Sequence, residues 1–259
     1  MTAAHWQNAV FSHQVSAHFG RRARSYASHA RLQQGVAWRL ARLCRGLALP
    51  AGPRADLGAG SGLVGQALRL QGDPSPLLQL DLCPQLLAHN PLASPGNHLV
   101  WDLNQGLPVQ LQQAALLTSS FALQWLDDPS AQLQHWCRQL HPGGWLALAV
   151  PTRASFPEWH QAAAAAAVPC TALPLPDAEA LQAAAVRSGL TLHCSQRLTF
   201  RRSYGTGLGF LLQLKTLGAG ASRSSRLAPG QLRRLLDCWP ADGRVSWEVL
   251  VLLGQRREP

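Results

Sequence analysis

The sequence predicts an α/β fold in which helices cover both faces of a mostly parallel, doubly wound sheet. Apolar runs alternate with helix-like segments between residues 54 and 150, at the spacing of strand–helix units. A glycine-rich turn follows the first of these runs and precedes a predicted helix. The chain has 259 residues, 47% of them apolar, which is enough for one substantial core.

The first expected element is helical. Residues 1–50 have amphipathic, helix-like patterning, and proline at position 50 ends the region. Four apolar side chains recur at helical spacing on one face, namely Leu32, Val36, Leu40 and Leu43.

The strands of the core are expected in five apolar runs, at residues 54–58, 77–82, 98–103, 114–120 and 145–150. The helices between them are expected to begin near Gly62, Pro84 and Pro129. This alternation is typical of a parallel sheet with crossover helices.

The alternation stops after residue 150. An alanine-rich helix is expected at residues 158–168. A second helix is expected at 177–190, where Asp177 suits the N-cap position and Gly189 the C-terminal stop.

The net charge of +10 is almost wholly due to arginine, since Lys215 is the only lysine. A basic balance suits an anionic partner such as nucleic acid, a membrane surface or an acidic protein. The arginines are spread along the chain, however, so a compositional preference for arginine over lysine explains the charge equally well.

Composition also excludes several classes of protein. No apolar stretch approaches the roughly 18 residues of a membrane span, and the N-terminal segment lacks the pattern of a secretory signal. The 6 cysteines are dispersed, without the spacing of a metal site or a redox pair. We therefore expect a reduced, cytosolic protein that binds no metal and no membrane.

The glycine turn reads DLGAGSG and contains Gly58, Gly60 and Gly62. Glycine lets the backbone approach a ligand closely at the start of a helix. The spacing of Gly60, Gly62 and Gly65 also matches a dinucleotide fingerprint, so the turn alone does not identify its ligand.

Three aspartates at the ends of successive predicted strands resolve this ambiguity. Asp56 at the end of the first strand would repel a pyrophosphate but suits a cationic amino-acid moiety. Asp81 follows the second strand, where a carboxylate can accept both ribose hydroxyls, and Asp102 follows the third, where it can meet an adenine amino group. This combination favours S-adenosylmethionine, which has an ammonium group, a sulfonium and no phosphate.

Two more strands are expected at residues 191–202 and 245–257, separated by a helical stretch at about 207–237. One domain with helical additions explains this order better than two domains. We expect a single domain over residues 1–259 with N-terminal helices at 1–50, a cofactor-binding core at 54–150, helical lid insertions at 151–190 and 205–240, and C-terminal strands at 191–204 and 244–257.

The chain resembles the class I S-adenosylmethionine-dependent methyltransferases. That resemblance implies a Rossmann-like, seven-stranded sheet ending in an antiparallel hairpin. More specifically, the sequence resembles the malonyl-acyl-carrier-protein O-methyltransferases of biotin synthesis (the BioC family). The similar segments are FGRRARSYASHARLQ (19–33), SSFALQWLDDP (119–129), SFPEWHQA (155–162), LKTLGA (214–219) and GRVSWEVLVLLGQRR (243–257).

The sequence also departs from this family. Ser120 stands where members often have asparagine, and Leu212 where they often have arginine. A tryptophan expected after Gln161 is absent, and residues 168–174 replace a histidine-rich linker. The loss of a basic residue at position 212 leaves the anchor of the substrate open.

The expected site residues follow from the strand ends and the resemblance. The expected cofactor contacts are Asp56, Gly58, Gly60, Gly62, Asp81, Leu82, Asp102, Leu103 and Ser119. The expected substrate contacts are Trp125, Trp159, Arg201, Arg202 and Lys215. Tyr26 is expected to orient a carboxylate, although packing is an alternative role for this tyrosine and for both tryptophans.

The resemblance implies methyl transfer to the free carboxylate of malonyl-acyl carrier protein, giving an ester that primes pimeloyl synthesis for biotin. A carboxylate is already ionised near neutral pH, so no general base is required. The acidic carrier protein is expected to dock on an arginine-rich rim made of Arg201, Arg202, Arg223, Arg226, Arg233 and Arg234. We expect a monomer.

Three other functions stay open: a methyltransferase for another small carboxylic acid or metabolite, a nucleic-acid methyltransferase, and a catalytically silent cofactor-binding homologue. The segment SSFALQW after the fourth strand differs from the Pro-Pro-Tyr-like motif of many base methyltransferases. Aromatic residues are not interleaved with a basic run, so a nucleic-acid partner is not expected.

Overall fold

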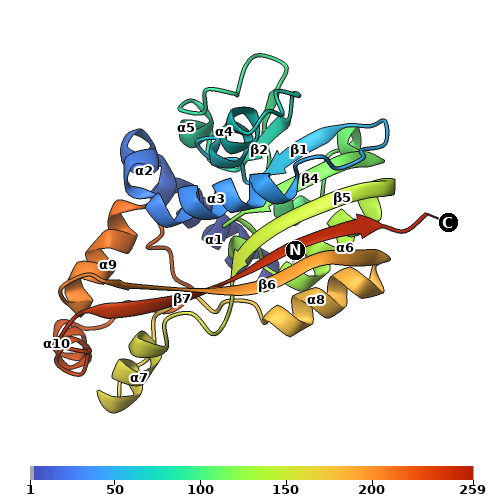
Figure 1. The fold of residues 1–259 in the computed structure, drawn as a ribbon. Coiled ribbons are helices and arrows are strands. Elements are labelled where there is room, and N and C mark those ends of the chain that lie inside the picture. The colour runs from blue at the N-terminus through green and yellow to red at the C-terminus, as the bar shows by residue number, and fades with distance from the viewer. Residues whose placement is uncertain (1–2, 259) are drawn as a thin grey trace.

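A computed structural model describes residues 3–258, with side chains described from residue 10 onward. In this part of the chain one seven-stranded sheet has the order β3-β2-β1-β4-β5-β7-β6 (Figure 1). The strands are β1 (Arg54–Leu57), β2 (Leu78–Asp81), β3 (His98–Val100), β4 (Ala114–Ser120), β5 (Leu140–Pro151), β6 (Leu190–Ser203) and β7 (Arg244–Arg256). The first five are mutually parallel, and β7 runs antiparallel to both β5 and β6. The predicted doubly wound sheet with an antiparallel C-terminal hairpin is thus confirmed.

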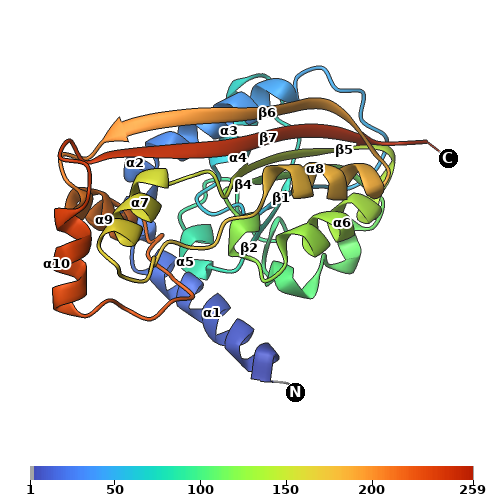
Figure 2. The same ribbon diagram turned by 90° about the horizontal axis from the view of Figure 1, so that it is seen from below.

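Helices cover both faces of the sheet. Figure 2 shows α3 (Arg31–Leu43) and α4 (Leu63–Leu70) on one side and α6 (Pro129–Gln139) and α8 (Ala178–Arg187) on the other. The remaining helices are α1 (Ala3–Gly20), α2 (Ala23–His29), α5 (Pro84–Leu87), α7 (Pro157–Ala165), α9 (Gly207–Thr216) and α10 (Pro229–Asp237), with short 3-10 turns at η1 (Leu103–Gln105), η2 (Val109–Leu111) and η3 (Leu123–Trp125).

Two apolar layers form because side chains alternate across each strand. Leu117 and Leu148 pack with Trp136 of α6 on one face. Leu116 and Ala147 pack with α3 and α4 on the other. The central strands are therefore apolar on both faces, as is typical of parallel sheets between helical layers.

Several element boundaries differ from those predicted, and β5 begins at Leu140 although the predicted run begins at residue 145. The N-terminal helical region is divided into α1, α2 and α3, with a turn at residues 21–22 and an interruption at Ala30. Strand β3 ends at Val100, because Asp102 caps the 3-10 turn that follows by accepting the N–H of Asn104. Helix α7 ends before the alanine run does, since Ala167 takes a left-handed conformation.

Strands β6 and β7 extend beyond the parallel strands, and α7, α9 and α10 gather at their projecting end (Figure 1). These helices and strands share a separate aromatic core. Its buried aromatic side chains are Phe156, Trp159, Phe210, Trp239 and Trp247. We call this part of the molecule the lid. Helix α8 lies within the expected lid insertion 151–190 but packs on the sheet instead, where Leu181 joins the core with Leu148.

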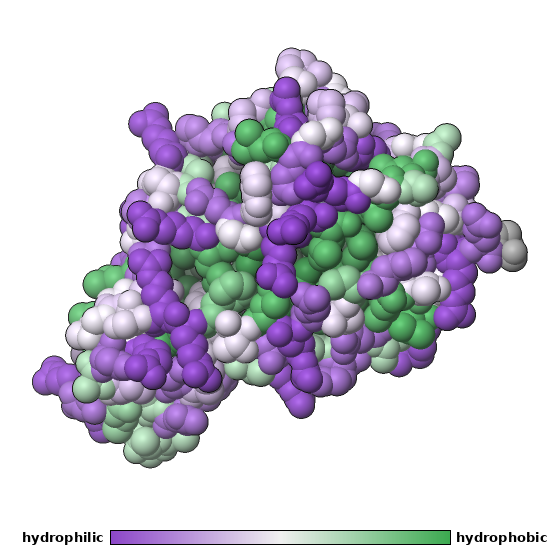
Figure 3. All heavy atoms as spheres, in the orientation of Figure 1, coloured by the Kyte–Doolittle hydropathy of each residue, from purple (hydrophilic) through white to green (hydrophobic). Residues whose placement is uncertain are grey.

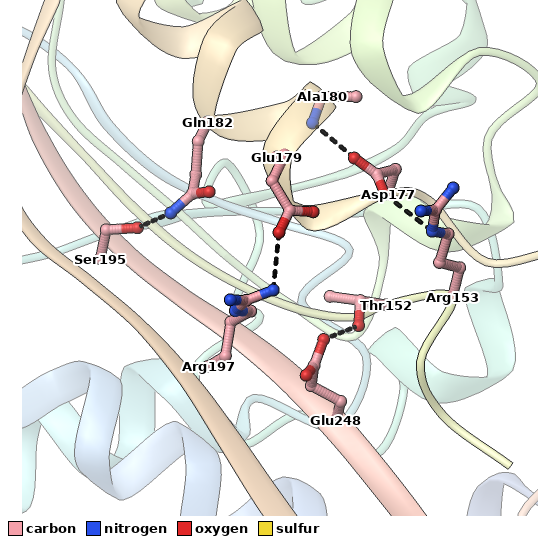
Figure 4. Close-up of polar contacts among 9 residues, drawn as sticks. All are labelled: Thr152, Arg153, Asp177, Glu179, Ala180, Gln182, Ser195, Arg197 and Glu248. Atoms are coloured by element: carbon pink, nitrogen blue, oxygen red, sulfur yellow. Dashed lines mark hydrogen bonds and ion pairs between the residues drawn. The ribbon is translucent and has the colours of Figure 1, made fainter. Parts of the chain in front are cut away.

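Polar contacts hold the chain where it leaves the sheet for the lid (Figure 4). Thr152 donates a hydrogen bond to the Glu248 carboxylate at 2.6 Å. Asp177 caps α8 by accepting the N–H of Ala180, and it pairs with Arg153 at 2.8 Å. The lid segment before α8 is thereby held at both ends.

On the face drawn in Figure 3, polar side chains cross the surface in bands with hydrophobic atoms between them. Among the residues that the structure describes, no helix is both long enough and apolar enough to cross a bilayer.

Candidate functional site

Three adjoining cavities lie at the carboxyl ends of the parallel strands, where open α/β sheets bind their ligands. The strand-end cavity includes Gly60, Asp81 and Asp102 in its lining. The glycine-turn cavity includes Asp56 and Gly58. A larger lid cavity of about 480 Å³ lies between the sheet and the lid. Tyr26 of α2 lines all three cavities.

The turn between β1 and α4 requires glycine at two positions that the sequence singled out. Gly58 and Gly62 have φ values of +74° and +82°, in the left-handed region that glycine favours. A Cβ on Gly58 would lie 2.2 Å from the Cβ of Ala122, and one on Gly62 would lie 2.2 Å from Oδ1 of Asn90. Gly62 therefore shapes the turn through packing and lines none of the three cavities.

Asp56 is an almost fully buried carboxylate, with 1% of its surface exposed. Its Oδ1 accepts a hydrogen bond from the Thr118 hydroxyl at 2.8 Å, and its Oδ2 has no partner among the described residues. Burial raises the pKa of Asp56 to about 7, a shift that the Thr118 hydrogen bond opposes and the charge of Asp81 reinforces. A cationic ligand group beside Oδ2 would favour the ionised form.

Asp81 joins the second strand to the glycine turn. Its Oδ2 accepts the N–H of Gly60 at 2.7 Å and its Oδ1 accepts the N–H of Cys83 at 2.7 Å. Burial raises the pKa of Asp81 to about 6, and these two backbone donors limit the rise. Each carboxylate oxygen keeps further acceptor capacity, so the group can still receive two hydroxyls from a ligand.

The remaining expected cofactor residues divide into two groups. Leu82, Asp102 and Leu103 line the strand-end cavity, as expected for residues that follow β2 and β3. Ser119 lines none of the cavities, because its side chain points to the opposite side and donates to the Leu57 carbonyl at 2.8 Å. The next residue, Ser120, lines two of them, and its buried Oγ has no partner among the described residues.

Aromatic side chains form much of the wall of the lid cavity. Trp125 lines both the strand-end cavity and the lid cavity, and Trp159 lines the lid cavity. Phe121 and Phe19 are also shared between these two cavities. Aromatic rings therefore border both cavities where they adjoin.

The basic residues expected to contact the substrate do not all reach the cavity. Arg201 and Arg202 are exposed on β6 and line none of the cavities, and Arg202 packs its guanidinium 5.2 Å from the ring centre of Tyr204. Lys215 does line the lid cavity, together with Arg226 and His18. The sequence places Arg226 only on the expected docking rim.

Tyr26 lies where the three cavities meet. Burial raises the pKa of its hydroxyl above the ordinary value, and the negative charge of Asp81 raises it further. The phenol therefore stays protonated at neutral pH and can act only as a hydrogen-bond donor or as an acceptor through its lone pairs.

Two glutamines, Gln33 and Gln124, line the lid cavity together with Tyr26, and the sequence analysis did not single out Gln33. Gln33 of α3 lines both the glycine-turn cavity and the lid cavity. Gln124 is 6% exposed and donates to the Phe121 carbonyl at 2.7 Å, while its Oε1 has no partner among the described residues. Both lie in the segments 19–33 and 119–129, which resemble the BioC family in sequence.

Comparison with known families identifies a methyltransferase domain over residues 37–195. A malonyl-[acyl-carrier protein] O-methyltransferase from Enterobacter lignolyticus is 32% identical over 87% of this chain and 89% of its own length. The biotin biosynthesis bifunctional protein BioCD of Bordetella avium is 34% identical over 95% of this chain, which spans only 52% of that longer protein.

Solved structures agree with the fold. A putative methyltransferase from Bacillus halodurans superposes with a TM-score of 0.58 at 14% identity, covering 85% of this chain and 99% of its own. A geranyl diphosphate methyltransferase in complex with S-adenosylmethionine superposes with a TM-score of 0.52 at 13% identity, covering 87% and 86% of the two chains. At these identities the likeness concerns the fold alone.

Proposed function

The chain belongs to the family of malonyl-[acyl-carrier protein] O-methyltransferases, and on this premise we propose that it methylates the free carboxylate of a malonyl thioester. S-adenosylmethionine is the methyl donor in this proposal, and an acyl carrier protein carries the malonyl group. The observation that carries it is the meeting of three cavities at Tyr26, two of them lined by the strand-end aspartates and the third enclosed by the lid.

The donor set around the first two cavities fits S-adenosylmethionine. The unpartnered Oδ2 of Asp56 suits the ammonium group, and the carboxylate of Asp81 suits the two ribose hydroxyls. Asp102 is available for the adenine amino group. When bound, the cofactor supplies a methyl group made electrophilic by the adjoining sulfonium.

The acceptor chemistry needs little from the protein beyond position and exclusion of water. A carboxylate oxygen forms the new bond to the methyl carbon as the carbon–sulfur bond breaks, and no proton moves. The carboxylate is already ionised, since its ordinary pKa is about 4. Charge is lost from both reactants, so the aromatic border formed by Phe19, Phe121 and Trp125 favours the transition state over a polar ground state.

Neutral donors are suited to orient the reacting carboxylate. Tyr26 is held in its protonated form by burial, and the amide of Gln33 lines the same junction. Holding a carboxylate oxygen in line with the methyl group can supply a large part of the rate enhancement through proximity. Trp125 and Trp159 act in this scheme as walls.

One arginine of the expected docking rim, Arg223, is already bound to other side chains of the protein. Arg223 pairs with Asp127 at 2.8 Å and lies 3.9 Å from the ring centre of Phe11. It therefore has structural partners of its own. Arg233 and Arg234 of α10 are exposed and belong to no ion pair among the described residues. We propose these two as the carrier contacts that salt would weaken.

The direct test is to incubate the purified protein with S-adenosylmethionine and malonyl-acyl carrier protein and to follow the carrier by intact mass. The expected result is the mass gain of one methyl group. It should form faster on the carrier than on malonyl-coenzyme A or a free short diacid. An Asp56→Ala variant, which we expect to bind the cofactor weakly, serves as the control. Cofactor binding without transfer to any malonyl thioester would contradict the proposed acceptor and favour a silent homologue or a different substrate.

A further inference from the structure

Three basic side chains from separate segments line one part of the lid cavity. His18 belongs to α1, Lys215 to α9, and Arg226 to the loop between α9 and α10. The first two segments meet at Gly220, where an added Cβ would lie 3.6 Å from Nδ1 of His18 and 3.8 Å from the Cα of Lys215. We call these three residues the basic cluster.

The charge of this cluster is not balanced within the described chain. Neither Lys215 nor Arg226 belongs to any of the ion pairs among the described residues. Burial lowers the pKa of His18, and the positive charges of Arg21, Arg226 and Lys215 lower it further. Lys215 and Arg226 therefore present unpaired positive charge to the cavity, and His18, whose lowered pKa favours the neutral imidazole, adds a hydrogen-bonding group beside them. This combination suits an anionic ligand group.

Two anions on the proposed substrate compete for this role: the malonyl carboxylate and the phosphate ester of the pantetheine arm. The carboxylate loses its charge during methyl transfer. A cation bound directly to it would stabilise the ground state more than the transition state and would slow the reaction. The phosphate keeps its charge throughout, so its contact with a cation strengthens binding without this penalty.

The position of the cluster suits binding of the phosphate better than binding of the reacting carboxylate. Its three residues line the lid cavity but neither the strand-end cavity nor the glycine-turn cavity. Tyr26, which lies at the junction of the three, is a neutral group. The two cations, Lys215 and Arg226, thus line only the lid cavity and not the cavities that hold the strand-end aspartates.

The size and walls of the lid cavity also exceed what a malonyl group needs. Its volume of about 480 Å³ lies in the range of pockets that enclose drug-sized ligands. Leu173, Leu211 and Leu232 contribute apolar wall that a short dianionic acid would not use. A thioester-linked pantetheine arm is long enough to occupy this space and end at a phosphate.

We propose that the basic cluster of His18, Lys215 and Arg226 binds the phosphate ester of the pantetheine arm that carries the malonyl group. This inference rests on the proposed function, because it assumes a malonyl thioester as acceptor. It assigns the cluster to recognition of the arm and leaves orientation of the carboxylate to the neutral groups at Tyr26.

The test compares malonyl-pantetheine with malonyl-4′-phosphopantetheine, which differ only in the phosphate. For the unmodified protein we expect kcat/KM to be at least about tenfold higher with the phosphorylated compound, corresponding to about 1.4 kcal/mol. Arg226→Gln should lower kcat/KM for the phosphorylated compound and for malonyl-acyl carrier protein, mainly through KM. It should leave the rate with malonyl-pantetheine unchanged. Arg187→Gln, an exposed charge at the end of α8 that lines none of the cavities, is the matched control.

Other outcomes separate this inference from the proposed function. If Arg226→Gln lowers kcat/KM equally for malonyl-pantetheine and malonyl-4′-phosphopantetheine, the cluster binds the carboxylate and not the phosphate. Equal rates for the two compounds with the unmodified protein would overturn the inference while leaving methyl transfer intact. If no malonyl thioester is methylated, isothermal titration calorimetry should compare the affinity of the protein for 4′-phosphopantetheine with its affinity for pantetheine. Phosphate-dependent binding that Arg226→Gln abolishes would then support the cluster although the proposed function had failed, and its absence would overturn both.

Discussion

The carboxylate of Asp81 accepts a hydrogen bond from the backbone N–H of Gly60 at 2.7 Å. This contact joins the end of β2 to the glycine turn that follows β1, and Gly58 and Ala59 add a second link by donating to the Leu80 carbonyl. The turn is therefore held against the neighbouring strand by hydrogen bonds within the protein. One side chain both shapes the turn and offers oxygen atoms to the cavity.

Asp81→Asn should weaken cofactor binding because it removes the charge and replaces one acceptor oxygen with an NH₂ donor. Hydrogen bonds to charged groups contribute about 1.5–3 kcal/mol, which corresponds to a Kd increase of about 10- to 100-fold. Isothermal titration calorimetry with S-adenosylmethionine measures this. Asp128→Asn at the N-cap of α6 is a suitable control, since asparagine and aspartate cap helices about equally well and Asp128 lines none of the cavities. An unchanged Kd in Asp81→Asn would exclude this carboxylate from the cofactor site.

Stability of the ligand-free protein should depend on pH through Asp56. Its folded pKa is raised from 3.8 to about 7 by burial, so folding favours the protonated form. The stabilising contribution of this group is complete below about pH 4 and is lost as the pH rises through about 7. Urea unfolding across this range should show a smaller decline in Asp56→Asn than in the unmodified protein. Parallel curves for the two proteins would contradict the assignment.

Cofactor binding should show the opposite dependence on pH. The ammonium group of the cofactor favours the ionised form of Asp56, so binding below about pH 7 releases a proton from the carboxyl. Affinity should rise as the pH increases from 5 to 7 and then level off. Calorimetry in two buffers of different ionisation enthalpy measures the proton release directly. The absence of any released proton at pH 6 would show that Asp56 is not beside the cation.

Gly58→Ala should disrupt the turn, whereas Gly46→Ala tests the backbone effect alone. Both glycines have φ near +70°, and a non-glycine residue there costs about 1–2 kcal/mol. A Cβ at Gly46 meets nothing within 4 Å, but one at Gly58 would lie 2.2 Å from Ala122. Gly46→Ala should lose about 1 kcal/mol of stability and keep cofactor affinity. Gly58→Ala should lose more stability and bind the cofactor weakly, and equal behaviour of the two variants would refute the role given to the Ala122 contact.

Tyr26→Phe should lower turnover at saturating cofactor if the phenol orients the acceptor carboxylate. Loss of a hydrogen bond to a charged group at about 1.5–3 kcal/mol corresponds to a decrease in kcat of about 10- to 100-fold. The only other tyrosine, Tyr204, packs against Phe210 and lines none of the cavities, so Tyr204→Phe is the matched control. A decrease in stability with unchanged kcat would assign Tyr26 to packing instead.

Phe210→Ala should destabilise the lid. Its ring is fully buried between Phe156, Trp159 and Trp239, and truncating a buried phenylalanine typically costs about 3–5 kcal/mol. The matched control is Leu208→Ala on the same helix, where the side chain is 44% exposed. Hydrogen exchange should show faster exchange in α9 and α10 of Phe210→Ala, with β1 and β4 little changed. Uniformly faster exchange would mean that lid and sheet unfold together.

The alternation of apolar runs with helix-like segments predicted the sheet, and the positions of three aspartates predicted its functional edge. Both inferences depend on local pattern. Parallel strands all end at the same edge of a sheet, so residues that follow successive strands come together without further information. Asp56, Asp81 and Asp102 accordingly lie beside two adjoining cavities.

Only the tertiary structure decided which of several similar residues face those cavities. Ser119 and Ser120 are adjacent in sequence, but side-chain alternation directs one to the Leu57 carbonyl and the other to the cavities. Arg201 and Arg202 are both exposed on the edge strand β6, while Arg226 reaches the lid cavity from a loop. Such placements depend on how segments far apart in the chain pack together. A pattern of neighbouring residues determines the elements, and the packing of distant ones determines which side chains meet.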